Sequence, residues 1–219
     1  MQIKFIKPSF DITLPMPGLE MLKHIEKAGR TCYKSEDKIT DDSALSFIKM
    51  IVKRGHESVL EHCSFSVRFI CDRGVSHELV RHRIASFSQE STRYVGYGDA
   101  IEFIIPSWMG LEPCQFDMQQ GFNNTFKVER RIEWIKAMEN SARHYYTLLK
   151  ECEWRPEQAR SVLPNSLKTE IVVTANLREW RHIFKLRKSM AAHPDMRAMM
   201  EPLWIKVSGM IPGVFDDLE

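Results

Sequence analysis

The sequence has few cysteines, almost no net charge and no long apolar run, and each of these absences excludes a class of protein. Five cysteines in 219 residues, without a Cys-x-x-Cys pair, argue against a disulfide framework and a cysteine zinc site. We therefore expect reduced thiols that lie mostly in the core. The formal charge is only +2, and no apolar run approaches the ~18 residues of a membrane-spanning helix. The opening MQIKFIKPSF lacks the apolar stretch of a signal peptide, so we expect a cytoplasmic protein without a membrane partner.

The composition that remains is typical of a folded globular protein. Hydrophobic residues make up 43% of the chain and charged residues 27%, which is too apolar for a disordered chain. Ten glycines and ten prolines are scattered rather than clustered, and no repeat or linker divides the sequence. We therefore predict a single domain over residues 1–219.

Hydrophobic periodicity predicts both strands and helices. Period-two or short apolar patterns predict strands at 2–7, 64–71, 101–106 and 168–175. Apolar residues at helical spacing, with capping residues and prolines at the ends, predict helices at about 19–25, 41–54, 76–85, 125–152, a short one from 156, 177–192, and one from 194. Because strands and helices do not alternate regularly, we expect an α+β fold with a mixed or antiparallel sheet flanked by several helices, one of them long.

Several familiar motifs are absent by spacing. His77 and His82 are five residues apart, which would turn the second ring about 140° around a helix, so they cannot share one zinc ion. There is no P-loop sequence, and GYG at 96–98 does not continue into a dinucleotide-binding fingerprint. We therefore expect no metal site.

The segment at 81–94, RHRIASFSQESTRY, has the composition of an anion-binding loop. Arg81, Arg83 and Arg93 can meet phosphate with paired N–H donors, and neutral donors lie between them. These donors are Ser86, Ser88, Gln89, Ser91 and Thr92. The alternative is a solvated basic helix end, which the composition alone does not exclude.

The predicted helix at 177–192 carries an arginine in its apolar stripe. The stripe comprises Leu177, Trp180, Phe184 and Ala191, and Arg187 shares their face. A buried guanidinium needs a partner that the stripe does not provide, unless the side chain extends to the core margin and reaches water. Residues 178–188 also hold five basic groups against Glu179 alone. On a nearly neutral protein, two such local patches favour a small polyanionic ligand over a nucleic acid.

The same residues form a pattern that resembles a known family. Arg81-His82-Arg83 is followed by seven residues and then Ser91, which resembles the R-H-R-x7-S signature of the flavin-dependent thymidylate synthase (ThyX-type) family. The blocks GHESVLEH at 55–62 and ARSVLP at 159–164 occur in the family's order. So do Asn176, Arg178, Leu186 and Arg187, and the resemblance covers about residues 20–200.

The resemblance implies reductive methylation of dUMP to dTMP, with FAD as cofactor and NADPH and methylenetetrahydrofolate as co-substrates. It implies a homotetramer with active sites at subunit interfaces, with small-molecule rather than nucleic-acid partners. The family's flavin-contacting positions match His56, Ser58, Arg81, His82, Arg83, Gln89, Asn176, Leu177, Arg178 and His182. Its nucleotide-binding positions match Glu78, Arg81, Gln89, Glu90, Ser91, Thr92, Arg93, Arg160 and Arg187. The resemblance assigns Arg187 to stabilising the ionised uracil and Ser91 to nucleotide binding, with no Ser or Cys nucleophile.

Four positions depart from the family's pattern. Glu78 stands where glutamine is familiar, Ser88-Gln89 replaces Asn-Glu, and His182 replaces asparagine. We expect Glu78 to bond the ribose or a backbone amide, or to point away, because a carboxylate repels phosphate.

Two other functions would share features of this sequence. A nucleic-acid-binding module would share the arginines, and a flavoprotein reductase without methyl transfer would share the cofactor residues. Considered alone, a loop histidine such as His56 is usually structural, and Arg160 could equally be a surface residue.

Overall fold

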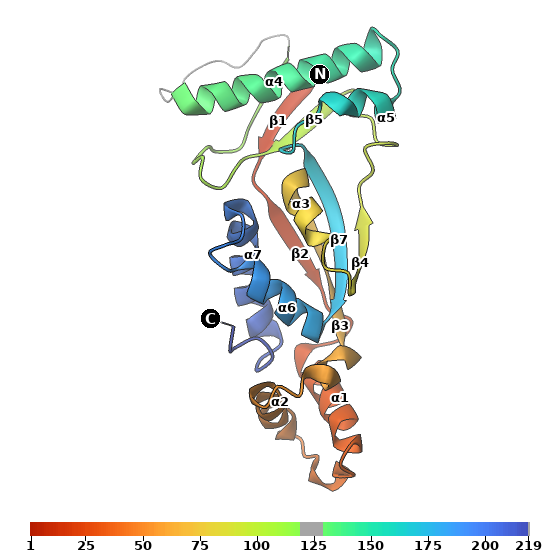
Figure 1. Ribbon diagram of the computed structural model, residues 1–219, viewed down its shortest axis with the longest axis vertical. Helices are drawn as coiled ribbons and strands as arrows, with labels where there is room; N and C mark the ends of the chain where they lie inside the picture. The colour runs from red at the N-terminus through yellow and green to blue at the C-terminus, as the bar shows by residue number, and fades with distance from the viewer. Residues whose placement is uncertain (119–128, 219) are drawn as a thin grey trace. The chain divides into compact units, whose positions relative to one another are not determined.

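The computed structural model describes residues 1–118 and 129–218 (Figure 1). Within this range the chain forms two compact units, each assembled from three separate segments. The first unit consists of Met1–Ser9, Phe69–Leu79 and Ser88–Ile171. The second unit consists of Phe10–Arg68, Val80–Phe87 and Val172–Glu219.

Three strands of the first unit form a mixed sheet of order β5-β1-β6. The bounds are Gln2–Ile6 for β1, Ala100–Ile104 for β5 and Cys114–Asp117 for β6. Strand β1 is parallel to β5 and antiparallel to β6. Alternation along β1 places Ile3 and Phe5 in the core, opposite Ile101 and Phe103. The predicted mixed sheet is confirmed, but β6 was not predicted, because CQFD contains one large apolar residue and shows no clear alternation.

Helix α4 (Glu129–Lys150) contributes the other side of this core. The predicted apolar face is confirmed, since four of its members are buried with the sheet residues: Ile135, Met138, Ala142 and Tyr145. The predicted start of this helix, at residues 125–128, lies outside the described residues. The other helices of the first unit are α3 (Arg73–Leu79), α5 (Pro156–Ala159) and the 3-10 turn η3 (Arg160–Val162).

A second sheet has the strand order β2-β3-β7-β4. Its strands are β2 (Ser9–Thr13), β3 (Ser64–Asp72), β7 (Lys168–Asn176) and β4 (Ala85–Gln89). Every second residue of β3 and β7 is buried, which confirms the alternation predicted for residues 64–71 and the strand predicted at 168–175. The helices of the second unit are α1 (Gly18–Thr31), η1 (Glu36–Lys38), α2 (Ser43–Lys53), η2 (Glu57–His62), α6 (Leu177–Arg187) and α7 (Pro194–Met210). Gly55, with φ of +72°, follows α2 as its predicted stop.

Helix α6 is fixed within the second unit by a capping residue and a buried tryptophan. The Asn176 side chain accepts a hydrogen bond from the Glu179 backbone N–H at 2.8 Å, which confirms the predicted helix start. Trp180 is fully buried and stacks on Phe65 with 4.8 Å between ring centroids. Its Nε1 also donates to the Phe65 carbonyl at 3.1 Å. These contacts fix the helix that carries three of the ten predicted flavin residues, Leu177, Arg178 and His182, and whose N-cap, Asn176, is a fourth.

Three local predictions were wrong. The helix predicted at 76–85 spans Arg73–Leu79 instead, because the Asp72 carboxylate accepts a hydrogen bond from the Val75 N–H and sets its start. Residues 85–89 form strand β4, and α6 ends at Arg187, so Ala191 lies exposed beyond it. All five cysteines are free, but just two, Cys63 and Cys71, are buried.

None of the helices within residues 1–118 and 129–218 combines the length and apolar character that crossing a bilayer requires.

Candidate functional site

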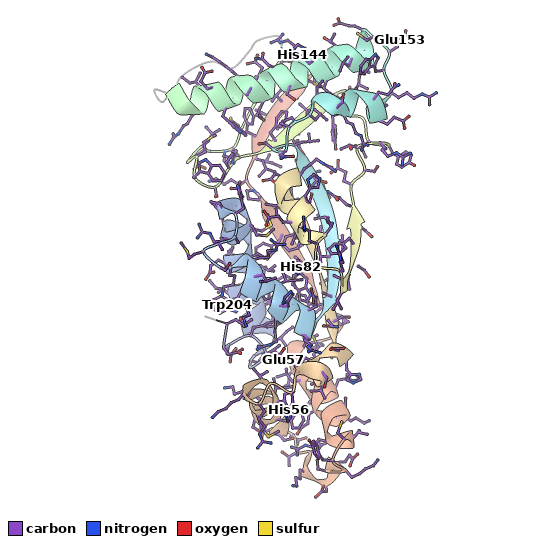
Figure 2. All side chains as sticks on the ribbon, viewed as in Figure 1. His56, Glu57, His82, His144, Glu153 and Trp204 are labelled. Carbon is purple, nitrogen blue, oxygen red and sulfur yellow. The ribbon has the colours of Figure 1, made fainter. Side chains whose placement is uncertain are left out.

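The centre of the R-H-R motif contacts Arg187 within the second unit. The motif lies in the turn between α3 and β4, where Arg81 and Arg83 are exposed and His82 between them is buried (Figure 2). Arg187 Nε donates a hydrogen bond to His82 Nε2 at 2.9 Å. Arg187 is half-buried, and His82 is a hydrogen-bond partner from outside its own helix. Two family blocks more than 100 residues apart in sequence therefore meet at one hydrogen bond.

His82 is held in one tautomer by its partners on α6. Because Nε2 accepts from Arg187, the ring proton sits on Nδ1, which faces Glu179 Oε1 at 3.3 Å. The His182 ring lies edge-on to the His82 ring, with 5.7 Å between centroids. Burial, with the charge of Arg187 and of His182, lowers the pKa of His82 to about 4, so the ring is neutral at pH 7. The side chains of His82, Glu179 and His182 lie close enough together to be considered as metal ligands. However, one His82 nitrogen accepts a hydrogen bond from Arg187 and the other faces Glu179, so neither is left to bind a metal ion.

The depressed pKa makes stability depend on pH. An unfolded histidine binds a proton near pH 6.5 but His82 in the folded chain binds one near 4, so stability is lost as pH falls between these values. Between pH 7.5 and 4.5, we expect wild type to lose about 1–3 kcal/mol relative to a His82→Gln variant. Urea unfolding of both proteins at the two pH values measures this difference. As a control, His144→Gln replaces an exposed histidine of α4 and should show the same pH dependence as wild type. A pH-independent difference between wild type and His82→Gln would contradict it.

A cavity of about 1130 Å³ in the second unit contains part of the predicted flavin set. Asn176, Arg178 and His182 line it, together with Lys185 and Trp204. Six other predicted flavin residues of this unit do not line it: the exposed His56, Ser58, Arg81 and Arg83, and the buried His82 and Leu177. The cavity therefore brings together three of the predicted flavin residues.

The basic patch predicted on α6 is largely neutralised by carboxylates of the same unit. Arg178 donates to Glu61 at 2.6 Å. The buried Arg181 pairs with Glu57 at 3.0 Å and with Asp217 at 2.6 Å, and it also donates to the Val214 carbonyl. Hydrogen bonding from Arg181 lowers the pKa of Asp217. The excess of basic groups counted along residues 178–188 is therefore partly offset in the fold by acidic partners that are distant in sequence.

In the first unit, the residues that end β4 are tied to buried neighbours. The Gln89 amide nitrogen donates to Ser76 Oγ at 2.9 Å and to Thr169 Oγ1 at 3.2 Å, and both hydroxyl residues are fully buried. The Glu90 carboxylate accepts from the Tyr97 hydroxyl at 2.9 Å and from Lys168 Nζ at 3.1 Å. Gln89 and Glu90 thus fix the start of the segment that follows β4 through hydrogen bonds within the protein.

The following residues form a turn beside a smaller cavity. The Ser91 hydroxyl accepts a hydrogen bond from the Arg93 N–H at 3.3 Å, and Arg93 is exposed. Thr92 is buried, and its Oγ1 accepts from Arg160 Nη1 at 2.9 Å. Thr92 and Arg160 both line a cavity of about 310 Å³ in this unit, whereas Glu78 is half-buried in α3 and does not line it. The structure thus brings together two predicted nucleotide residues 68 positions apart.

Sequence reasoning missed several residues of these sites. Glu179 was counted as a lone acid of the helix, although its contact with His82 links α6 to the R-H-R motif. Arg73 and His77 line the smaller cavity, and Trp204 lines the larger one. No spacing signal identifies Arg73, which opens a short helix directly after a strand.

Comparison with known proteins identifies the family. Residues 19–213 match the family described as thymidylate synthase complementing protein. The chain belongs to this family. A flavin-dependent thymidylate synthase of Geobacter sulfurreducens is 34% identical over 198 residues, covering 87% of this chain and 78% of the relative. One from Corynebacterium efficiens is 35% identical over 208 residues, covering 92% and 80%.

Solved structures of this family share the fold. The crystal structure of thymidylate synthase X from Helicobacter pylori with FAD and dUMP matches with a TM-score of 0.71 at 24% identity, covering 96% of this chain and 99% of that one. As a member of the thymidylate synthase complementing protein family, the chain is an enzyme of the transferase class. The resemblance inferred from the R-H-R-x7-S pattern is thereby confirmed.

Proposed function

We propose that the chain converts dUMP to dTMP, with methylenetetrahydrofolate as one-carbon donor and NADPH as reductant of a bound FAD. The observation that carries this proposal is the hydrogen bond between His82 and Arg187, which unites the R-H-R motif with the arginine assigned to the uracil ring. Family membership over residues 19–213 and relatives named for this reaction support it.

The residues around the larger cavity fit a flavin nucleotide. Its volume, about 1130 Å³, is at the upper end of small-molecule sites, as a dinucleotide requires. Asn176, Arg178 and His182 offer polar contacts, while Phe184 and Trp204 offer aromatic surface. Bound FAD, once reduced, supplies the hydride that completes the methyl group. The H. pylori structure, which contains FAD and dUMP, supports the same ligands here.

The chain's own contribution to the chemistry is electrostatic. Uracil C5 becomes nucleophilic as the ring loses its N3 proton, and a fixed cation against the ring stabilises that charge. Arg187 can take this role because the group that accepts a hydrogen bond from its Nε, His82, is neutral and adds no negative charge beside the guanidinium. Glu179 orients His82 in turn, so the guanidinium is positioned before substrate arrives.

Covalent catalysis by serine or cysteine is not part of the proposal. Ser91 Oγ accepts a backbone hydrogen bond within its turn, which suits a binding hydroxyl rather than an activated nucleophile. Burial raises the pKa of the Cys63 and Cys71 thiols, so both resist forming the reactive thiolate.

The proposed assembly is a cytoplasmic homotetramer with active sites at subunit interfaces, in which residues 1–219 act as one synthase domain. The proposed flavin residues fall mainly in the second unit, and the proposed nucleotide residues Glu90, Ser91, Thr92, Arg93 and Arg160 fall in the first. We propose small-molecule ligands, with neither nucleic acid nor membrane among its partners.

A flavin titration tests the proposed function. The purified protein is loaded with FAD, desalted, and mixed anaerobically with NADPH in the presence and absence of dUMP. We expect a retained flavin band that NADPH bleaches at a rate sensitive to dUMP. Failure to retain FAD would contradict the proposal, and bleaching that ignores dUMP would favour a flavoprotein reductase.

A further inference from the structure

Among the described residues, the smaller cavity of the first unit is lined by basic residues without acidic ones, whereas the lining of the larger cavity includes several carboxylates. Arg73, His77 and Arg160 line it, and none of the nine described residues of its lining is acidic. Around the larger cavity, by contrast, Arg178 and Arg181 are paired with carboxylates. Unneutralised arginines in a concave site attract a compact, multiply charged anion.

Arg73 is held in place by its backbone, whereas one end of its side chain lacks a partner. Its N–H donates to the Asn165 carbonyl at 2.8 Å, and its carbonyl accepts from Ser76 Oγ at 3.0 Å. The Nη1 atom is buried and has no hydrogen-bond partner among the described residues. Leaving a charged donor buried and unpaired is unfavourable, so an incoming anion gains from meeting it. Because Nη1 is buried, the guanidinium must turn to bring this atom to the cavity that Arg73 lines. No hydrogen bond to another described residue has to break at Nη1 for that turn.

Arg160 and Thr92 supply the matching donors in the same cavity. Arg160 is exposed apart from its bond to Thr92 Oγ1 at 2.9 Å, which leaves further guanidinium N–H groups for a ligand. Because Thr92 accepts that bond, its own hydroxyl proton can be donated. The cavity volume, about 310 Å³, suits a single small ligand rather than a polymer.

We propose that Arg73 joins Arg160 in binding a phosphate monoester dianion, the 5′-phosphate of the nucleotide substrate. Two guanidinium groups match the two charges of this group, and each forms paired hydrogen bonds to its oxygens. The inference rests on the proposed function for the identity of the nucleotide. It adds a phosphate-binding residue that the R-H-R-x7-S pattern does not contain.

The test compares ligands with and without the phosphate on FAD-loaded protein. Calorimetry measures the affinity of wild type, Arg73→Met, Arg73→Lys and Arg143→Met for dUMP, deoxyuridine and inorganic phosphate. Arg143, exposed on α4 and paired with Glu139, is the matched control. We expect Arg73→Met to weaken dUMP and phosphate binding about 10- to 100-fold, with deoxyuridine binding unchanged. Arg73→Lys should bind dUMP with intermediate affinity, and Arg143→Met should equal wild type.

Three results would overturn the inference. Unchanged dUMP affinity in Arg73→Met would show that Arg73 does not contact the phosphate, and equal losses for dUMP and deoxyuridine would show a structural role. Binding of a decathymidylate without a terminal phosphate, at the affinity of dUMP, would also overturn it in favour of a nucleic-acid surface. If wild type forms no dTMP but Arg73→Met still loses phosphate affinity selectively, the proposed function fails while this inference stands.

Discussion

Replacing Arg187 with alanine is expected to lower the rate of dTMP formation at saturating dUMP by about 100- to 1000-fold. The substitution removes the cation proposed to face the pyrimidine, and it leaves His82 Nε2 without its donor. The loss should fall mainly on kcat, because the charge on the ring develops as the reaction proceeds. Steady-state assays with dUMP varied at fixed folate and NADPH separate kcat from KM.

Two further variants identify the cause of that loss. Arg187→Lys keeps the charge but replaces the planar donor of the bond to His82, so it should recover part of the rate. Lys206→Ala removes an exposed cation from α7 of the same unit and should leave the rate unchanged. An Arg187→Ala enzyme with wild-type kcat would refute the catalytic assignment.

The Trp180→Ala variant is expected to lose about 3–5 kcal/mol of unfolding free energy. The fully buried ring stacks on Phe65, and the truncation removes both this contact and the hydrogen bond to the Phe65 carbonyl. Because Trp180 anchors the helix that carries Asn176, Arg178 and His182, FAD retention should fall as well. Chemical unfolding and the flavin absorbance after desalting measure the two effects.

A matched tryptophan variant provides the control. Trp154 is 44% exposed, so Trp154→Ala should cost much less stability and leave flavin binding intact. Trp180→Phe, which keeps the stacking but lacks the indole N–H, should lie between wild type and Trp180→Ala. If Trp180→Ala matched Trp154→Ala in stability, Trp180 would not be the anchor of α6.

Sequence patterns predicted many of the strands and helices, because alternation and capping depend on residues that are close together in the sequence. The alternation in residues 64–71 predicted β3, and the Asn176 cap predicted the start of α6. The turn after Leu79 was misread as helix, because apolar residues at 79, 80 and 84 mimic helical spacing while the chain there turns toward β4. In that turn, His82 is buried while its neighbours Arg81 and Arg83 are exposed.

Charge pairing between distant segments could not be predicted in this way. The cationic face of α6 contains Arg178 and Arg181, but Glu57, Glu61 and Asp217 neutralise them from more than 30 positions away. His82, which accepts a hydrogen bond from Arg187, is also distant in sequence. It lies in the R-H-R motif, which was identified by its basic composition and its resemblance to the family and not as a partner of Arg187. A sequence shows that a buried charge needs a partner, but only the fold shows which residue provides it.

The most direct test of the account is the detection of dTMP itself. FAD-loaded protein is incubated anaerobically with dUMP, methylenetetrahydrofolate and NADPH, and the nucleotides are quantified by mass spectrometry. We expect one dTMP for each dUMP consumed, none when FAD, folate or NADPH is omitted, and about 100- to 1000-fold slower dTMP formation by the Arg187→Ala variant. NADPH oxidation without dTMP formation in the complete mixture would contradict the account.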